Sequence, residues 1–236
     1  NIIKPWTAKP KTIFQKNNSK IVSENTITIC VTNYNYSNYI IECLDSLAKQ
    51  TFKNLELIVI DDVSSDDSIK IINNWMKKNH KRFQKITLLK NETNQGPSSS
   101  RNIAINMASG ANIMIVDADN SLYPTAIAKM YEANSLANVE GVYSQIEIFG
   151  NQKGIGFSDI WDVQRLKIAN YIDVMALIRK TAWEKVNGFT HIEEGWEDYD
   201  FWLKFVDMEM ELAYLPQILC RYRVHGNSRT ATEAHV

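Results

Sequence analysis

The segment Ile113–Asp119 constrains the fold of this chain more than any other segment. It begins with four apolar residues and ends in Asp117 and Asp119, which only Ala118 separates. Such an apolar run is typical of a buried strand in an α/β sheet, and ligands collect at the carboxyl ends of parallel strands. Because side chains alternate along an extended backbone, both carboxylates should point to the same side. The segment therefore predicts a polar site at the end of a buried strand.

Two carboxylates directed at one point repel each other unless a cation or a proton lies between them. Oxygen ligands of this kind suit Mg²⁺ or Mn²⁺, which bind substrate phosphates through one or two carboxylates. The alternative is a strand end capped by two solvated aspartates, and short D-x-D patterns are common by chance. From this segment alone, both interpretations stay open.

The size and charge of the chain exclude some classes of protein. Its 236 residues suffice for one large α/β domain or two small ones. Its formal net charge is −1, whereas dedicated nucleic-acid binders usually carry a strong basic excess. Cys30, Cys43 and Cys220 are scattered and form no C-x-x-C pair. This pattern indicates free thiols in a reducing compartment rather than disulfides or a zinc site.

No apolar run reaches the length of a membrane span, and no signal peptide is visible. We therefore expect a cytoplasmic protein. The basic stretch Lys77–Arg82 leaves peripheral membrane contact open, although a solvated helix end is the interpretation that we favour. Because the first residue is Asn1 rather than Met, we also expect that the chain can be part of a larger, multidomain polypeptide.

Strand and helix patterns alternate in the first half of the chain. Apolar runs that predict strands cover Thr26–Val31, Leu55–Ile60, Ile86–Leu89 and Ile113–Val116, with helical apolar spacing between them. This alternation predicts a mostly parallel sheet flanked by helices, with right-handed crossovers. The polar stretches Thr32–Asn35, Asp61–Asp62 and Asp117–Asp119 should then lie along one edge of the sheet. Their convergence favours a ligand site more strongly than any one of them.

The second half alternates less regularly. We expect a helix over Pro124–Ala137, a strand or hairpin over Val139–Phe149 and a mobile loop, a candidate lid, over Gly150–Ser158. A strand over Asp173–Arg179, a helix that ends at Asn187-Gly188 and a helix that begins near Glu197 complete the prediction.

Two common phosphate cradles are missing from the sequence. No G-x-G-x-x-G follows the first strand, and no G-x-x-x-x-G-K-S/T occurs anywhere. A metal held by Asp119, with or without Asp117, is then the natural counter-charge for a diphosphate. Asp61 or Asp62 would accept hydrogen bonds from a base or a ribose. The alternative role for this pair is an acidic cap of the helix that follows.

Seven segments together carry a family resemblance. They are a T-x-N-Y-N turn after the strand at Ile27–Asn35, a V-D-D-G-S-x-D-like stretch at Leu57–Asp66, N-x-x-N-x-G-x-x-x-x-R-N at Asn91–Asn102, D-x-D at Asp117–Asp119, a G-G-F-like box at Asn187–Phe189, E-D-x-D-x-W at Glu197–Trp202 and Y-R-x-H-x-x-S at Tyr222–Ser228. In this order they resemble family 2 glycosyltransferases of the GT-A fold, over about Thr26 to Ser228. Two positions depart from the pattern: Val63 stands where Gly is usual, and Asn120 where a third acidic residue often follows.

The resemblance implies a metal-dependent, inverting glycosyltransferase that uses Mn²⁺ or Mg²⁺. It would move a hexose or N-acetylhexosamine from a nucleotide-diphosphate donor, commonly a UDP-sugar, to a hydroxyl of a glycan, lipid-linked or protein-linked acceptor. The implied nucleotide-sugar contacts are Thr32, Asn33, Tyr34, Asn35, Asp61, Asp62, Gly96, Arg101, Asp117 and Ala118. The implied metal ligands are Asp119, Asp117 and His225.

The resemblance also implies that Asp198, with Glu197, takes the proton of the acceptor hydroxyl. The alternative for Asp198 is a helix-terminal carboxylate stabilised by the helix dipole, which contributes about 0.3–1 kcal/mol. Trp196, with Glu197, would contact the acceptor, although a Trp here is as often part of the core. A lone His such as His225 is usually structural, whereas the family likeness directs it to the metal or the diphosphate.

We therefore expect one GT-A domain over residues 25–225. Its nucleotide-sugar-binding half would be 25–120 and its acceptor half 121–225, with an arm or linker at 1–24 and a tail at 226–236. Two rival functions stay open: a nucleotidyltransferase that makes activated sugars, and an inactive domain that binds a sugar nucleotide. The sequence identifies neither the sugar nor the acceptor.

Overall fold

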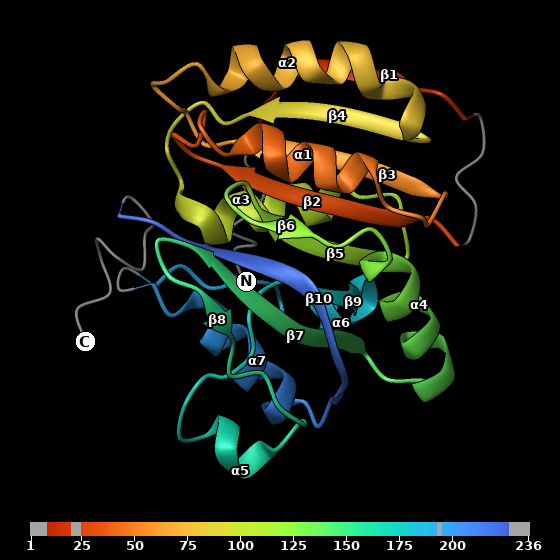
Figure 1. The fold of residues 1–236 in the computed structure, drawn as a ribbon, viewed down its shortest axis with the longest axis vertical. Helices are drawn as coiled ribbons and strands as arrows, with labels where there is room; N and C mark the ends of the chain where they lie inside the picture. The colour runs from red at the N-terminus through yellow and green to blue at the C-terminus, as the bar shows by residue number, and fades with distance from the viewer. Residues whose placement is uncertain (1–8, 20–24, 193–194, 227–236) are drawn as a thin grey trace.

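Four parallel strands form the centre of the sheet. The computed structural model describes residues 9–19, 25–192 and 195–226. The central strands are β2 (Ile27–Asn33), β3 (Leu55–Asp61), β4 (Lys85–Lys90) and β5 (Asn112–Asp117). They lie in the order β4-β3-β2-β5, as the upper half of Figure 1 shows. The parallel sheet that the alternation predicts is confirmed, and its strands are buried on both faces because helices cover each side.

The second half of the chain extends the same sheet with mixed directions. Five strands follow β5: β6 (Ser121–Leu122), β7 (Gly141–Gly150), β8 (Gly154–Ile155), β9 (Ala176–Arg179) and β10 (Leu212–Val224). β9 runs antiparallel to β5 and β7, and the long β10 runs parallel to β7. Consequently both halves share one sheet, in the order β1-β4-β3-β2-β5-β9-β7-β10-β6 with β8 paired to β7.

Part of the expected N-terminal arm or linker is instead a strand at one edge of the sheet. Lys11–Asn17 forms strand β1, which pairs antiparallel with β4. No strand pattern is visible in this segment, because both faces of the edge strand are mostly exposed and its polar residues do not alternate with apolar ones. Most of the expected C-terminal tail, residues 227–236, lies outside the described residues.

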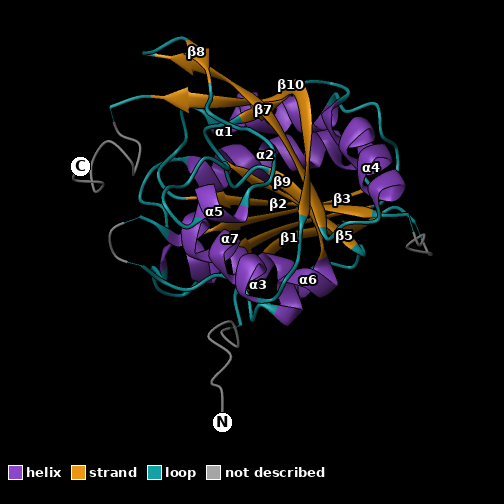
Figure 2. Cartoon of the chain, turned by 90° about the horizontal axis from the view of Figure 1, so that it is seen from below, coloured by secondary structure: helices purple, strands orange, loops and turns teal. Residues whose placement is uncertain are grey.

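Two helical layers cover the sheet, and Figure 2 shows one on each side. α1 (Ile40–Ala48), α2 (Ser68–Asn79) and α4 (Ala126–Ala137) pack on one face. α3 (Gly96–Met107), α6 (Lys180–Lys185) and α7 (Glu197–Asp207) pack on the other, and the short α5 (Val163–Leu166) lies against α7. Alternation along β2 divides the core: Ile29 and Val31 pack toward α1, whereas Cys30 packs toward α3.

Local contacts fix the ends of two helices. α2 begins at Ser68, with Asp67 as its N-cap residue. The Asp66 carboxylate accepts hydrogen bonds from the backbone N–H groups of Ser37 and Ser68, and so ties α2 to the turn before α1. α6 ends at Lys185 with Val186 as its C-cap residue, slightly before the predicted end, and Asn187 and Gly188 follow with positive φ.

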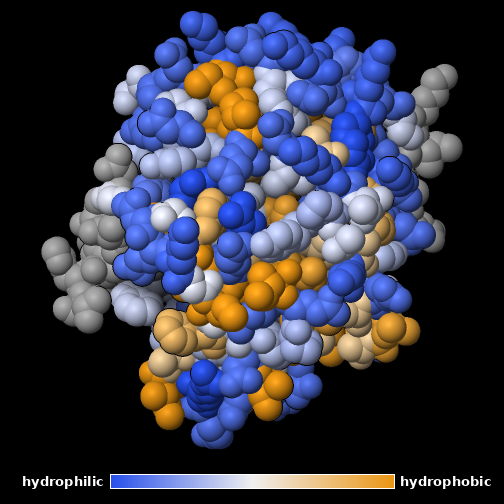
Figure 3. All heavy atoms as spheres, in the orientation of Figure 1, coloured by the Kyte–Doolittle hydropathy of each residue, from blue (hydrophilic) through white to orange (hydrophobic). Residues whose placement is uncertain are grey.

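The surface is mixed in character. Figure 3 shows apolar atoms gathered over the part of this face where β7 and β10 lie, with hydrophilic side chains over much of the remainder. Among the residues described, none of the helices has the length and apolar character needed to cross a bilayer.

Candidate active site

The polar ends of three parallel strands meet at one edge of the sheet, as predicted. Strand register places Thr32 of β2 opposite Asp117 of β5, and Asn33 opposite Asp61 of β3. A cavity of about 1210 Å³ opens at this edge, which is large enough for a nucleotide sugar. The first half of the chain supplies lining residues from Thr32 to Asn120, and the second half supplies residues from Ile146 to Tyr222.

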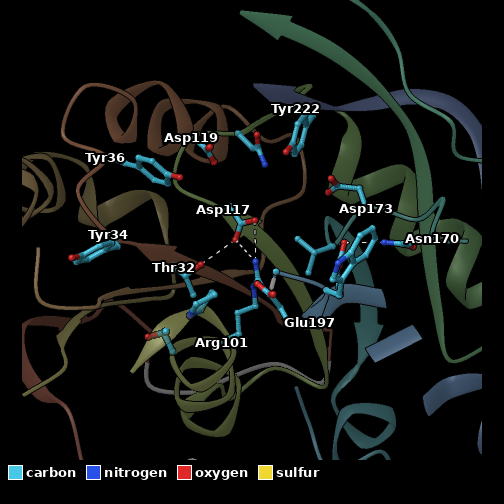
Figure 4. A pocket seen from close by; sticks show the side chains of 18 of the residues that line it. Thr32, Tyr34, Tyr36, Arg101, Asp117, Asp119, Asn170, Asp173, Glu197 and Tyr222 are labelled. Atoms are coloured by element: carbon cyan, nitrogen blue, oxygen red, sulfur yellow. Dashed lines mark hydrogen bonds and ion pairs between the residues drawn. The ribbon is translucent and has the colours of Figure 1, made fainter. Parts of the chain in front are cut away.

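Asp117 is held by a buried ion-pair network rather than left open. Arg101 Nη2 donates to Asp117 Oδ1 and Oδ2 at 2.9 and 3.1 Å, and Thr32 Oγ1 donates to Asp117 Oδ1 at 3.0 Å. Arg101 Nη1 also donates to Glu197 Oε1 at 3.2 Å, so one guanidinium joins α3, β5 and α7 (Figure 4). Arg101 and Glu197 are both buried, which makes this contact costly to break.

Asp119 pairs with His225 across the sheet edge. His225 Nε2 lies 3.0 Å from Asp119 Oδ2, and the rings of Tyr39 and Tyr36 pack against the imidazole with centroids 4.4 and 5.5 Å away. Burial and the neighbouring charge of Asp117 raise the pKa of the Asp119 carboxyl. A cation beside Asp119 would therefore relieve an unfavourable buried charge.

The donor set here fits a metal that a substrate helps to hold. Throughout residues 9–19, 25–192 and 195–226, no three His, Cys, Asp or Glu side chains are grouped closely enough to hold a metal ion. Asp119 supplies one carboxylate to the cavity with the His225 imidazole behind it, while Asp117 is engaged by Arg101. A Mg²⁺ or Mn²⁺ site made of few protein ligands and completed by phosphate oxygens matches this arrangement.

The aspartates at the end of β3 face different surroundings. Asp61 is fully buried, accepts hydrogen bonds from Asn33 Nδ2 and from the N–H and Oγ of Ser64, and does not line the cavity. Asp62 does line it, and its carboxylate accepts hydrogen bonds from Asn91 Nδ2 at 2.7 Å and from the Gly96 N–H at 2.7 Å. Asp62 thus fixes the loop that carries Gly96 along the cavity wall.

Asp198 lines the cavity from the first turn of α7. Its Oδ2 accepts a hydrogen bond from Asn170 Nδ2 at 3.0 Å, and its Oδ1 accepts one from the Tyr199 N–H at 2.8 Å. Burial raises the pKa of the Asp198 carboxyl to about 6, although the positive charge of Arg101 opposes this rise. A partly buried carboxylate with a raised pKa is suited to accept a proton near neutral pH.

Most of the site residues expected from the sequence lie together in this cavity. The lining includes Thr32, Asn33, Tyr34, Asn35, Asp62, Gly96, Arg101, Asp117, Asp119, Trp196, Glu197 and Asp198. Three others do not line it: Asp61, Ala118, which is fully buried, and His225, which reaches it only through Asp119. Trp196 is 49% exposed, so it belongs to the cavity mouth rather than to the core.

Some lining residues on the second half of the chain were not predicted from the sequence. Asn170 and Asp173 precede β9 and point into the cavity, and Tyr222 of β10 lies near Asp119 in Figure 4. Tyr222 belongs to the Y-R-x-H segment, which could have identified it. Asn170 and Asp173 carry no motif, because only the tertiary fold brings their segment beside Asp198.

The predicted lid is partly ordered as a hairpin. Within Gly150–Ser158, β8 pairs antiparallel with β7, while Gly156, Phe157 and Ser158 line the cavity. Phe157 is 81% exposed, so an apolar ring borders the cavity.

Comparisons with known proteins agree with this geometry. Residues 28–186 match the family model for glycosyl transferase family 2. An uncharacterized glycosyltransferase of Haemophilus influenzae is 33% identical over 181 residues, which cover 75% of this chain and 70% of that protein. An Escherichia coli protein, the UDP-Glc:alpha-D-GlcNAc-diphosphoundecaprenol beta-1,3-glucosyltransferase, is 26% identical over 216 residues, which cover 88% of this chain and 80% of that one.

Two solved structures share the fold. S. aureus TarS in complex with UDP-GlcNAc superposes with a TM-score of 0.76 at 20% identity, over 89% of this chain and 62% of the TarS chain. A Pyrobaculum calidifontis mannosyltransferase in complex with GDP-Man and Mn²⁺ superposes with a TM-score of 0.68 at 19% identity, over 97% of this chain and 63% of that one. This chain thus spans less than two thirds of either solved chain. The sheet with its helical layers is the GT-A fold, and the chain belongs to glycosyl transferase family 2.

Proposed function

We propose that this chain is a metal-dependent, inverting glycosyltransferase that takes its sugar from a nucleotide diphosphate, preferably uridine diphosphate. The observation that carries the proposal is the arrangement of one cavity. Asp119, which His225 contacts from behind, lines the cavity on the strand-end side, and the partly buried Asp198 lines it from α7. A site for a departing diphosphate and a site for proton removal therefore face the same space.

The nucleoside would bind beside the first two strand ends. Tyr34 is 48% exposed and lines the cavity next to Asn33 and Asn35, so its ring is available to a base or a ribose. Asp62 would act mainly by holding the loop from Asn91 to Gly96 in place, because backbone N–H groups of that loop already occupy its carboxylate. Uridine as the base is supported by the UDP-sugars named for the E. coli relative and for TarS.

Asp119 would hold Mn²⁺ or Mg²⁺ together with diphosphate oxygens, and His225, which contacts Asp119 Oδ2, would orient that carboxylate. When bound, the ion would neutralise the charge that develops on the leaving diphosphate. Mn²⁺ is also present in the Pyrobaculum structure of the same fold. Arg101 would keep Asp117 turned toward α3, so that Asp119 remains the carboxylate available to the ion.

Asp198 would take the proton from the acceptor hydroxyl. The Asn170 amide orients its carboxylate, and the raised pKa of about 6 makes it a stronger base than an ordinary aspartate while still ionised at neutral pH. The acceptor would enter at the mouth, where Trp196 is exposed and can stack on a sugar ring. A lipid-linked glycan acceptor is supported by the diphosphoundecaprenol acceptor in the name of the E. coli relative.

The test measures donor turnover by the purified chain with and without Mn²⁺, over UDP-glucose, UDP-galactose, UDP-GlcNAc and GDP-mannose. We expect turnover of at least one UDP-sugar that EDTA abolishes and Mn²⁺ restores. Asp198→Asn keeps the size of the side chain but cannot accept the proton, so turnover should fall by roughly 10²–10⁴-fold. Donor affinity, measured by calorimetry, should change little because the diphosphate is bound elsewhere.

Asp200→Asn is the matched control. Asp200 also lies in the first turn of α7, but it pairs with Lys204 at 2.9 Å and does not line the cavity. This variant should keep near-normal turnover. If both variants lost turnover equally, Asp198 would have only the role of a helix-terminal carboxylate. Donor binding without any turnover would favour an inactive binding domain, and release of pyrophosphate from UTP and a sugar phosphate would favour a nucleotidyltransferase.

A further inference from the structure

Asp173 is a carboxylate of the cavity that no step of the proposed reaction uses. It precedes β9, lines the cavity and points into it from the side of Asn170 and Tyr222 in Figure 4. The backbone N–H of Met175 donates to its Oδ1 at 2.8 Å, and no donor to Oδ2 is found among the described residues. Asp173 is partly exposed, so Oδ2 is open to a hydrogen-bond donor on a bound ligand.

The surroundings of Asp173 also disfavour the negative charge of its carboxylate. Burial raises the pKa of the Asp173 carboxyl to about 7, and the negative charges of Asp117 and Asp198 add to the rise. Among the described residues that line the cavity, Arg101 is the lone Lys or Arg side chain, and it is already bound to Asp117 and Glu197. A bound ligand that donates hydrogen bonds would therefore gain more here than at an exposed aspartate.

The position of Asp173 indicates which part of a nucleotide sugar it would meet. In Figure 4, Tyr34 and Tyr36 lie on one side of Asp117, and Asp173 and Asn170 lie on the other. A donor with its nucleoside at Tyr34 and its diphosphate at Asp119 would place its sugar toward Asp173. The acceptor would approach from the mouth, where Trp196 is 49% exposed, whereas Asp173 is less exposed.

We propose that Asp173 determines sugar specificity by accepting a hydrogen bond from a hydroxyl of the transferred sugar, so that the site takes a neutral pyranose and rejects a uronic acid. This inference rests on the proposed function, because it assumes that a nucleotide sugar occupies the cavity. A sugar hydroxyl supplies the donor that Asp173 Oδ2 lacks. A uronate would instead bring a further carboxylate beside those of Asp117, Asp173, Glu197 and Asp198. Arg101 could not compensate this charge, because it is already paired with Asp117 and Glu197.

Calorimetric binding to the full chain with Mn²⁺ tests the proposal with UDP, UDP-glucose, UDP-galactose, UDP-GlcNAc and UDP-glucuronic acid. We expect the wild-type chain to bind the best neutral UDP-sugar at least about 10-fold more tightly than UDP-glucuronic acid. Asp173→Asn should weaken neutral-sugar binding by about 10-fold and narrow that gap, while the affinity for UDP itself stays unchanged. Asn retains an oxygen for the Met175 N–H, so the local backbone contact can persist.

Asp159→Asn is the matched control, because Asp159 is exposed, pairs with Arg165 and lies outside the cavity lining. It should leave every affinity unchanged. The proposal is overturned if Asp173→Asn binds the neutral UDP-sugars as tightly as the wild-type chain. It is also overturned if the wild-type chain binds UDP-glucuronic acid as well as UDP-glucose, a comparison that needs no variant. A wild-type chain that binds none of the UDP compounds would remove the proposed function itself, and this inference with it.

Discussion

Val63 holds a backbone conformation that its side chain disfavours. Its φ is +67°, in the left-handed region where a β-branched residue is a clear outlier. The residue directly follows Asp62, and Ser64 after it donates to Asp61, so the strained turn sets the geometry of the strand end. Strain at such a position persists only where the surrounding contacts impose it.

Val63→Gly should therefore stabilise the chain. A left-handed conformation costs a non-glycine residue about 1–2 kcal/mol, and the larger backbone entropy of unfolded glycine cancels about half of the gain. We expect an increase of about 0.5–1 kcal/mol in the free energy of unfolding, measured with urea. Val63→Ala keeps the Cβ atom and should give little of this gain. A Gly variant no more stable than the wild-type chain would show that Val63 is not strained.

At the scale of elements, the four central strands and the meeting of their polar ends were predictable. Buried parallel strands carry long apolar runs, and the register of such strands brings their ends together. β1, β6 and β8 were not predictable, because two are only two residues long and β1 is an exposed edge strand. β10 was missed because its pattern is broken by Pro216 and by shifts in its register with β7.

In the site, too, some features were predictable from the sequence and others were not. Motif residues on the strand ends were predictable one by one, but their partners were not. Nothing in the spacing of Arg101, Asp117 and Glu197 indicates that a single guanidinium binds both carboxylates. That contact depends on how α3 and α7 pack on the same face of the sheet, which the local sequence does not encode.

Arg101 links three elements, and its removal should weaken the chain accordingly. Arg101→Met would leave Asp117 and the buried Glu197 without their shared positive charge, which costs about 3–5 kcal/mol for a buried pair. Urea unfolding without donor measures this loss. Arg101→Lys keeps the charge but not the forked geometry, so its loss should be intermediate. A Met variant within about 1 kcal/mol of the wild-type chain would contradict a structural role for the network.

At the scale of the whole molecule, two carboxyls of the cavity should make stability and the rate of sugar transfer depend on pH in opposite directions. Burial raises the pKa of Asp198 to about 6 and that of Asp173 to about 7, whereas an unfolded aspartate titrates near 4. Between about pH 4 and pH 7 the folded chain therefore binds more protons at these two positions than the unfolded chain does. By linkage, their contribution to stability falls as pH rises through this range.

The rate of sugar transfer should instead rise as pH increases through this range. Asp198 accepts a proton only when it is ionised, so kcat/KM should fall as pH decreases below about 6. The melting temperature without donor should meanwhile decrease between about pH 4 and pH 7, and Asp173→Asn with Asp198→Asn should remove most of that decrease. Thermal melts and a pH–rate profile on the same samples measure both trends. A double variant with the same pH-dependent melting as the wild-type chain would place the titration elsewhere. The expected result would show that ionising these two cavity carboxyls lowers the stability of the chain at neutral pH while it allows Asp198 to accept a proton.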